Sequence, residues 1–463
     1  MLHRKGAATL AACAALACAG IVRAESTGSE SQDGVVLHPT YFQETTTAPA
    51  TEPTTAPASQ PAAPAPKPLM AGLTAIGIGK PLSDANITIG GWVAGSYTVS
   101  ANGDSPHIPM AGRFFDTKNN RAVLNQIDLF IDRPVDYGKA AQNHTIDIGG
   151  HLELGYGWDF GLLHSSGIFD NPATLGVTDG YYASRDHPEN QFDILQAYLD
   201  FALPLGSGLR IRAGKFVTLL GYEVIAPTQN AFYSHSFLFS FAIPLTQTGV
   251  MGEYKLSDDW LIDAGITRGW NQSLNDNNGD PDFLGGVTFT PQASDFLKKW
   301  KFILNASLGP QGTNDNSNWW TVLDFQAIYT ATDKLTLAVN ADYGDAPHAP
   351  GVMGAAQWYG IAGYAAYTLN DYLTPNLRLE YYGDTKGFTL GVPAGSPAGT
   401  LPMGQNLYEA TVNVNIKPFP SDAIGQNLVI RPEVRLDYSE HRFFKSSTHY
   451  DQFTFGIDAY FTF

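Results

Sequence analysis

The sequence has no long apolar run after its first twenty-odd residues. A membrane-spanning helix needs about 18 to 20 consecutive apolar residues, and residues 25–463 contain no such run. Hydrophobic residues nevertheless make up 44% of the chain and aromatic residues 12%. This combination excludes a helical membrane protein and leaves soluble folds and β-structured membrane proteins.

Positive charge is also scarce. The chain has 27 Lys and Arg residues against 44 Asp and Glu residues, and its net charge is −17 at pH 7. Proteins that bind nucleic acids rely on Lys and Arg to neutralise phosphates. The balance therefore argues against a nucleic-acid partner and favours a solvated acidic surface or pore.

The first residues have the features of an export signal. Arg4 and Lys5 provide positive charge, residues 7–19 are apolar and mostly small, and residues 22–24 form a cleavage-like site. This order is typical of a secretory signal peptide. We therefore expect residues 1–24 to be removed on export.

Cysteine is nearly absent, and both copies lie in this signal. Removal of Cys13 and Cys18 would leave a mature chain without a disulfide, a thiol nucleophile or a cysteine-bound metal. A lipoprotein signal is the alternative, because residues 10–13 resemble a lipobox. The apolar run before Cys13 is short for such a signal.

Residues 25–85 are predicted to be an unfolded segment on the periplasmic side. Residues 43–68 consist almost wholly of Thr, Ala, Pro and Glu, a composition that buries too little apolar surface to offset the entropy of ordering. The simplest interpretation is a linker. Specific contact with the cell wall or a partner is the alternative.

From residue 86 to residue 463, apolar and polar residues alternate with a period of two. This pattern marks strands with one apolar face, and in a transmembrane barrel that face points to lipid. A soluble sandwich rarely buries a face that carries so many ionisable groups. The final strand shows the pattern most clearly, with Phe453, Phe455, Ile457, Ala459, Phe461 and Phe463 on one face.

Sixteen such strands can be placed. An even number is typical of bacterial barrels, as are long connections at one end and short turns at the other. The connections 100–120, 161–191, 219–245 and 384–404 are long, whereas those after residues 203, 256, 330 and 368 are short. The predicted strands are 86–99, 121–132, 144–160, 192–203, 208–218, 246–256, 259–270, 282–290, 299–308, 320–330, 334–343, 357–368, 375–383, 405–417, 427–438 and 451–463.

Tryptophans near strand ends suggest the aromatic girdles of a membrane barrel. Trp260 and Trp270 lie ten residues apart on the predicted lipid face of one strand, which is close to the height of the apolar band. Trp158, Trp300 and Trp320, with Trp358, also lie near predicted strand ends.

The alternation predicts which charged residues line a pore. Both signs are present, and such a mixture would orient dipolar solutes. One residue conflicts with the register: Lys215 falls on the lipid face, which implies either a bulge near Gly214 or a position at the headgroup level. The predicted pore-lining residues are Arg210, Arg212, Glu253, Asp263, Arg378, Glu380, Glu409, Arg431, Glu433 and Arg435.

One stretch carries a family resemblance. It contains Gly214-Lys215-Phe216, Gly221, Glu223, Pro227, Asn230, Phe232-Tyr233-Ser234, Pro244-Leu245-Thr246, Thr248-Gly249-Val250 and Gly269-Trp270. With these residues the chain resembles the OmpL-like family of β-barrel porins over roughly residues 85–463. The resemblance implies an outer-membrane barrel more firmly than any substrate.

The resemblance also implies a role for the third long connection, residues 219–245, which in sixteen-stranded porins folds into the lumen and narrows it. Residues 231–241 contain five aromatic residues and almost no charge, which favours a packed segment over a disordered loop. A seventeenth strand carrying Phe237, Phe239 and Phe241 is the alternative. The predicted constriction residues are Glu223, Gln229, Asn230, Tyr233 and His235.

No catalytic or cofactor motif is present. The sequence lacks G-x-S-x-G, H-E-x-x-H, a Walker loop and a dinucleotide fingerprint. Residues 234–236, Ser-His-Ser, are the one place for a nucleophile and base. Residues 275–282 carry spaced carboxylates but not the order of a calcium loop. We therefore expect no enzyme activity, cofactor or metal site.

These inferences together predict an all-β, up-and-down outer-membrane barrel that lets small polar solutes and ions diffuse through a water-filled channel. A channel selective for anions or sugars, or a structural anchor with a plugged barrel, is the alternative. The expected partners are outer-membrane lipid, small polar solutes and, through the C-terminal strand, the barrel-assembly machinery. A homotrimer is an expectation by analogy with other sixteen-stranded porins.

Overall fold

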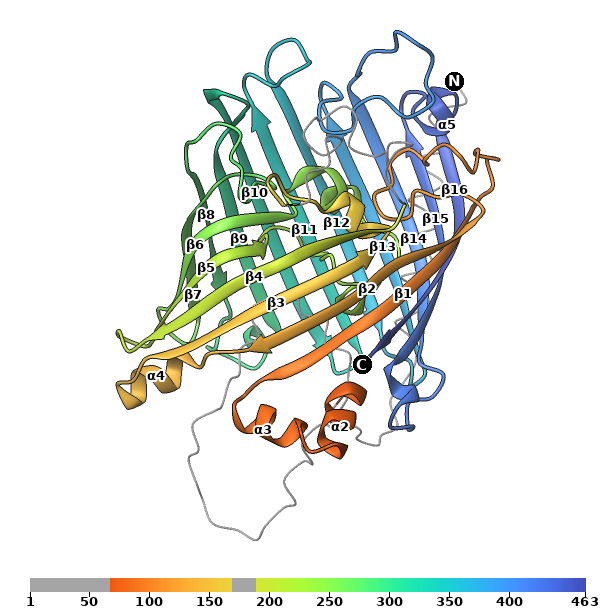
Figure 1. Ribbon diagram of the computed structural model, residues 1–463. Helices are drawn as coiled ribbons and strands as arrows, with labels where there is room; N and C mark the ends of the chain where they lie inside the picture. The colour runs from red at the N-terminus through yellow and green to blue at the C-terminus, as the bar shows by residue number, and fades with distance from the viewer. Residues whose placement is uncertain (1–66, 169–188) are drawn as a thin grey trace. The chain divides into compact units, whose positions relative to one another are not determined.

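A computed structural model describes residues 67–168 and 189–463. The predicted signal peptide, both cysteines and most of the predicted unfolded segment lie outside this part of the chain. In the described part, sixteen antiparallel strands each pair with their neighbours in sequence, and β16 (Asp451–Thr462) pairs with β1 (Thr88–Ser100). The sheet thus closes into the predicted barrel (Figure 1).

The strand bounds agree with the predicted ranges to within three residues at most ends. The largest departure is at the start of β10, which begins at Asp315 instead of residue 320. The remaining strands are β2 (Arg121–Arg133), β3 (Asp147–Gly157), β4 (Gln191–Leu203), β5 (Leu209–Val217), β6 (Thr246–Lys255), β7 (Trp260–Thr267), β8 (Asp282–Phe289), β9 (Trp300–Gly312), β10 (Asp315–Thr332), β11 (Leu335–Ala346), β12 (Ala356–Tyr367), β13 (Leu373–Asp384), β14 (Gln405–Ile416) and β15 (Leu428–Ser439).

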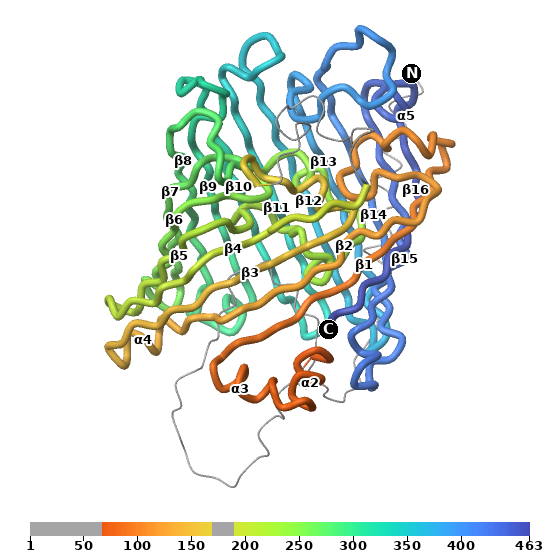
Figure 2. Tube along the Cα trace, viewed as in Figure 1, coloured from red at the N-terminus to blue at the C-terminus, as the bar shows by residue number. Residues whose placement is uncertain are grey.

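The helices are short, and none among the described residues is long and apolar enough to cross a membrane. In Figures 1 and 2, α2, α3 and α4 lie at the end of the barrel near the C-terminus, and α5 lies at the opposite end. The helices are α2 (Pro68–Ala75), α3 (Gly79–Asp84), α4 (Tyr137–Asn143) and α5 (Phe444–Ser447), with single turns η1 (Asp159–Leu162), η3 (Pro227–Gln229), η4 (Leu238–Ala242), η5 (Leu297–Lys299) and η6 (Gly425–Asn427).

Helices α2 and α3 correct one prediction, because the unfolded segment was expected to extend to residue 85. Contacts with the barrel stabilise these helices, whereas the composition of residues 43–68 provides little apolar surface to bury. Met70 of α2 is buried, and its sulfur accepts a hydrogen bond from the Ile89 N–H at 3.4 Å. Lys67, just before α2, donates to Asn427 at 3.0 Å.

The outer face of the barrel is apolar, as the alternation predicted. On β2, Ile127, Leu129 and Ile131 are each at least 40% exposed, while Gln126 and Asp128 on the other face of the strand are buried. Apolar residues that face lipid and polar residues that face the interior therefore alternate along the same strand.

A charge on this outer face should destabilise the barrel. Leu436 on β15 points outward between the buried residues Arg435 and Asp437. We expect Leu436→Lys to lower the free energy of unfolding by about 2–4 kcal/mol, the cost of Lys near the bilayer midplane. Denaturant unfolding in lipid vesicles measures this cost, with Ala398→Lys in an exposed loop as the control. Equal costs for the two variants would mean that the strand register is shifted by one residue.

Lys215 points into the barrel. Its Nζ lies 3.5 Å from the Asp193 carboxylate and donates to the Ile194 carbonyl at 2.6 Å. The strict alternation that predicted a lipid-facing Lys215 is broken at Gly214, where φ is +141° and a Cβ would lie 2.2 Å from the Ala197 carbonyl oxygen. Glycine therefore lets the strand change face at this point.

Of the six tryptophans that were predicted to lie in aromatic girdles on the outer face, two lie there and four do not. Trp260 is 41% exposed and stacks on Phe289 with ring centroids 4.3 Å apart, and Trp300 stacks on Tyr329 at 4.4 Å. The strand that was predicted to end at Trp270 ends at Thr267, and the chain beyond it turns inward. The tryptophans that pack inside the barrel are Trp158, Trp270, Trp320 and Trp358.

Candidate functional site inside the barrel

The inner wall of the barrel carries the charges that the sequence pattern assigned to a pore. The ten predicted pore-lining residues all lie on inward faces of strands, and all ten are buried. Their side chains therefore contact other protein groups in this structure. Three ion pairs join neighbouring strands: Arg212 to Asp200 at 2.7 Å, Arg210 to Glu253, and Arg431 to Asp458 at 2.6 Å.

Residues 219–245 lie inside the barrel and cover much of this wall. Two wall carboxylates accept pairs of backbone N–H groups from the segment. Glu433 accepts from Tyr233 at 3.0 Å and from Ser234 at 3.2 Å. Glu380 accepts from residues 237 and 238 at 2.7 and 2.8 Å. Charge-assisted bonds of this kind are about twice as strong as neutral ones, so these acids anchor the segment.

Three wall arginines bind the carbonyl groups of the same segment. Arg378 donates to the Ser234 oxygen at 2.7 Å and Arg435 to the His235 oxygen at 2.5 Å. Arg431 donates to the residue 230 oxygen at 2.6 Å. Buried backbone groups need hydrogen-bond partners. Here the wall supplies the partners that regular secondary structure would supply elsewhere.

Glu223 forms the central ion pair between the segment and the wall. Its carboxylate lies 2.6 Å from Arg378 Nη1 and accepts from the Ser236 N–H at 2.7 Å. Arg378 also pairs with Glu409 at 2.9 Å, and its side chain is fully buried. Burial acts to raise the pKa of Glu223, but Arg378, His235 and the Ser236 N–H outweigh it and hold the pKa below its ordinary value.

The other predicted constriction residues have mainly structural contacts. Asn230 accepts from the Val224 N–H at 2.9 Å, and the Tyr233 hydroxyl donates to Ser96 at 2.8 Å. Both side chains are buried, whereas Gln229 is exposed. A role in selecting solutes stays a prediction for all five residues.

His235 does not form the serine–histidine pair that residues 234–236 suggested. Its Nε2 interacts with the Val224 carbonyl at 3.0 Å, and the Ser234 hydroxyl accepts from Arg378 at 3.1 Å. Burial lowers the pKa of His235 more than the Glu223 carboxylate raises it, which favours the neutral ring.

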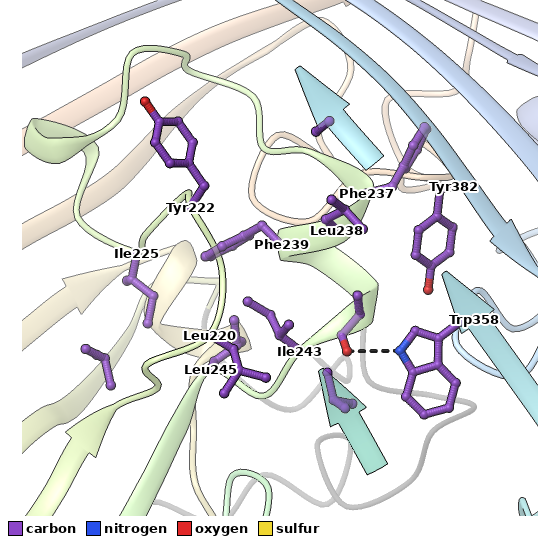
Figure 3. Packing of buried hydrophobic residues seen from close by; sticks show 14 of the residues in the cluster. Leu220, Tyr222, Ile225, Phe237, Leu238, Phe239, Ile243, Leu245, Trp358 and Tyr382 are labelled. Carbon is purple, nitrogen blue, oxygen red and sulfur yellow. Dashed lines mark hydrogen bonds between the residues drawn. The ribbon is translucent and has the colours of Figure 1, made fainter. Parts of the chain in front are cut away.

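The apolar part of the segment packs on strands β12 and β13. Phe237 and Leu238 lie beside Tyr382, and Trp358 donates its indole N–H to the Ala242 carbonyl at 3.0 Å (Figure 3). The seventeenth-strand alternative is wrong, because residues 238–242 form the helical turn η4. The segment is therefore held by a hydrophobic cluster as well as by charged groups of the wall.

Sequence reasoning identified the connection 100–120 only as a long loop and missed its contacts inside the barrel. Arg113 is buried and pairs with Asp437 of β15 at 2.7 Å and with Asp116 at 2.9 Å. The Phe115 ring packs edge-on against His235, with centroids 5.0 Å apart. The sequence did contain an indication of these contacts, an arginine followed by two phenylalanines in an otherwise polar loop. Two adjacent aromatic residues favour packing against other side chains, and a buried arginine needs a charged partner.

Two small cavities border Glu223. One has a volume of about 20 Å³ and is lined by Tyr222, Gln229, Phe232 and Tyr364, among others. The second, also of about 20 Å³, is lined mainly by apolar residues from 217 to 245. Both cavities therefore border the segment 219–245.

Comparisons with known proteins agree with this architecture. Residues 86–463 match the model of the family described as Putative beta-barrel porin-2, OmpL-like. The structure of Pseudomonas putida OprB at high pH is similar, with a TM-score of 0.54 at 13% identity over 86% of this chain and 99% of that one. The outer membrane channel DcaP of Acinetobacter baumannii gives 0.50 at 12% identity over 81% and 97%. These two likenesses bear on the fold alone. No curated protein matches the sequence.

Proposed function

This chain belongs to the family Putative beta-barrel porin-2, OmpL-like, and we propose that it is a narrow channel for passive diffusion of small polar solutes and ions, with an aperture set by residues 219–245. Family membership and the closed barrel make it a porin of the bacterial outer membrane. The dimensions of the path and the solutes that follow it belong to the proposal.

One observation supports the aperture: a 27-residue connection lies inside the barrel and binds charged groups of β13 and β15 and polar groups on other parts of its wall. Its contacts reach Ser96 on β1, Asn305 on β9 and Asn413 on β14. A segment held from several sides narrows any path along the barrel axis. Polar groups around it, among them Gln229 and Glu223, would contact a passing solute.

Trimming this segment should widen the path. We expect that replacing residues 226–240 by a short Gly/Ser link raises single-channel conductance severalfold in a planar bilayer and admits larger solutes. The barrel should still assemble, because its strands are paired independently of the segment. A matched control shortens the exposed residues 397–401. Equal conductance in wild type and the trimmed variant would contradict the proposed aperture.

Dense packing of the interior supports a second candidate, a structural anchor with a plugged barrel. In the described part of the chain, the ten predicted lining residues are all covered by protein. The same conductance measurement separates the candidates, because a plugged barrel conducts no ions. A channel selective for anions or sugars would instead show saturable flux and block of ion current by its solute.

Assembly and export complete the proposal. We expect residues 1–24 to direct export and the final strand to be recognised by the barrel-assembly machinery. The long connections would then face outward and α2, α3 and α4 the periplasm. Contact with outer-membrane lipid follows from the apolar outer face. Crosslinking in native membranes tests the expected homotrimer, which would appear as a band of three chains.

A further inference from the structure

Charged groups inside the barrel are strongly unbalanced. Among the described residues, nineteen buried side chains are Asp or Glu, and seven are Arg or Lys. They lie on inward strand faces or on the loops that enter the barrel. The lumen therefore has a surplus of carboxylates.

Each of the seven buried basic side chains is paired with a carboxylate. Arg378 and Arg435, for example, lie 2.9 Å from Glu409 and 2.8 Å from Asp437. The other five have carboxylate partners at 3.5 Å or less. Every buried positive charge in the described interior thus has a carboxylate partner. The acidic side chains that are left over determine the electrostatic potential there.

Several of the surplus acids face one another. Asp324 of β10 and Asp342 of β11 are directly opposite in the strand register, an arrangement in which like charges repel. Asn340 donates to both, at 2.6 and 3.2 Å, and Asn305 donates to Asp324 at 2.9 Å. These partners are neutral amides, and Asp342 Oδ2 accepts no hydrogen bond from a donor group.

A second position shows the same deficit of positive charge. Asp128 of β2 is fully buried, and neither of its carboxylate oxygens accepts a hydrogen bond from a donor group. The charged group that acts on it most strongly is the Glu153 carboxylate. A buried carboxylate without a partner is costly, so a proton shared with Glu153 or a mobile cation supplies the counter-charge. A shared proton in each facing pair would still leave acids in the majority.

The Asp324–Asp342 pair lies where the proposed aperture begins. Asn305 also donates to the Leu219 carbonyl at 2.8 Å, and Asn340 accepts from the Tyr222 N–H at 3.2 Å. The amides that surround the pair therefore also hold the first turn of residues 219–245. An acidic pair at this level acts on any ion that approaches the aperture.

We infer that this channel conducts cations in preference to anions, and that Asp342 and Asp128 are determinants of the preference. The inference rests on the proposed channel function. Low-dielectric walls focus the field of fixed charges along a narrow path, and rings of acidic side chains select cations in other channels.

The test is the reversal potential of the purified full-length protein in a planar bilayer under a KCl gradient. We expect wild type to be severalfold more permeable to K⁺ than to Cl⁻. Asp342→Asn and Asp128→Asn should each lower this ratio, and the double variant should lower it further. Both changes keep side-chain size, so heat-modifiability on gels should remain that of wild type.

A matched control is Asp333→Asn, which removes the same charge from the exposed turn between the same two strands. It should leave the ratio unchanged. An unselective or anion-selective wild type would overturn the inference while leaving the channel function intact. Equal ratios in wild type and the double variant would overturn the assignment of the two residues. Absence of any conductance would overturn the proposed channel, and the inference with it.

Discussion

A chain that lacks Phe461–Phe463 should fail to assemble in the outer membrane. These residues end the strand that closes the barrel. Phe461 pairs with Val93 of β1 and with Leu428 of β15, and the Phe463 backbone exchanges hydrogen bonds of 2.9 and 3.1 Å with Gly91. Their removal leaves unpaired backbone groups on both neighbouring strands at the closure.

The expected loss is large because lipid offers no replacement partner for these groups. Each unsatisfied N–H or C=O in the hydrocarbon region costs several kcal/mol, and an open sheet edge also invites aggregation. The geometry at the closure is tight as well, because a Cβ at Gly91 would lie 2.0 Å from the Asp128 carbonyl oxygen. A shift in the register of β16 therefore cannot easily restore the lost hydrogen bonds at the closure.

Heat-modifiable migration of the outer-membrane fraction measures assembly. The control is another deletion, that of residues 43–66, which precede the described part of the chain. It should leave assembly nearly unchanged. Phe463→Ala keeps the backbone and should give an intermediate yield, which separates side-chain recognition from strand pairing. Similar yields from both deletions would show that the final strand does not have the role assigned to it.

The strands were predictable because one requirement acts on every residue of a lipid-facing sheet. Phe325 must face outward while Asp324 and Gln326 face inward, and this alternation is visible in the sequence. Strict alternation does not hold where a local backbone feature breaks the period, as the conflict at Lys215 indicated. Gly214 and Lys215 show this, because only the positive φ of the glycine turns the lysine inward.

The contacts of the candidate site could not be predicted in the same way. Alternation placed Glu433 and Glu380 inside the barrel, and the aromatic composition of residues 231–241 indicated packing. Neither pattern indicated that Glu433 binds backbone groups about 200 residues away. Such pairings depend on the path of one irregular segment, and periodicity does not describe irregular backbone.

Replacing Arg378 by Ala should destabilise the segment inside the barrel. The guanidinium bridges Glu223 of the segment and Glu409 of β14 and also binds the Ser234 carbonyl at 2.7 Å. Both carboxylates are at least 95% buried. Removing one partner of a buried ion pair costs about 3–5 kcal/mol, since an uncompensated charge remains; here that charge is Glu223, because Glu409 keeps Arg435 within 3.9 Å.

The measurement is denaturant unfolding in lipid vesicles together with single-channel current. We expect the Arg378→Ala barrel to unfold more easily by that amount and to show noisier, larger conductance as the segment loosens. Lys298→Ala is the control, because its pair with Asp295 at 3.9 Å is exposed and such pairs contribute about 0–1 kcal/mol.

A double-mutant cycle locates the effect. If Arg378 stabilises the segment through Glu223, Arg378→Ala in a Glu223→Gln background should cost less than in wild type, because the charge that would be left without a partner is already gone. Arg378→Lys keeps the charge but not the planar fork that contacts three groups at once, so its cost should lie between those of wild type and Ala. A cost for Arg378→Ala no greater than that for Lys298→Ala would contradict the anchoring role, and with it the view that charged wall residues hold the segment 219–245 in place.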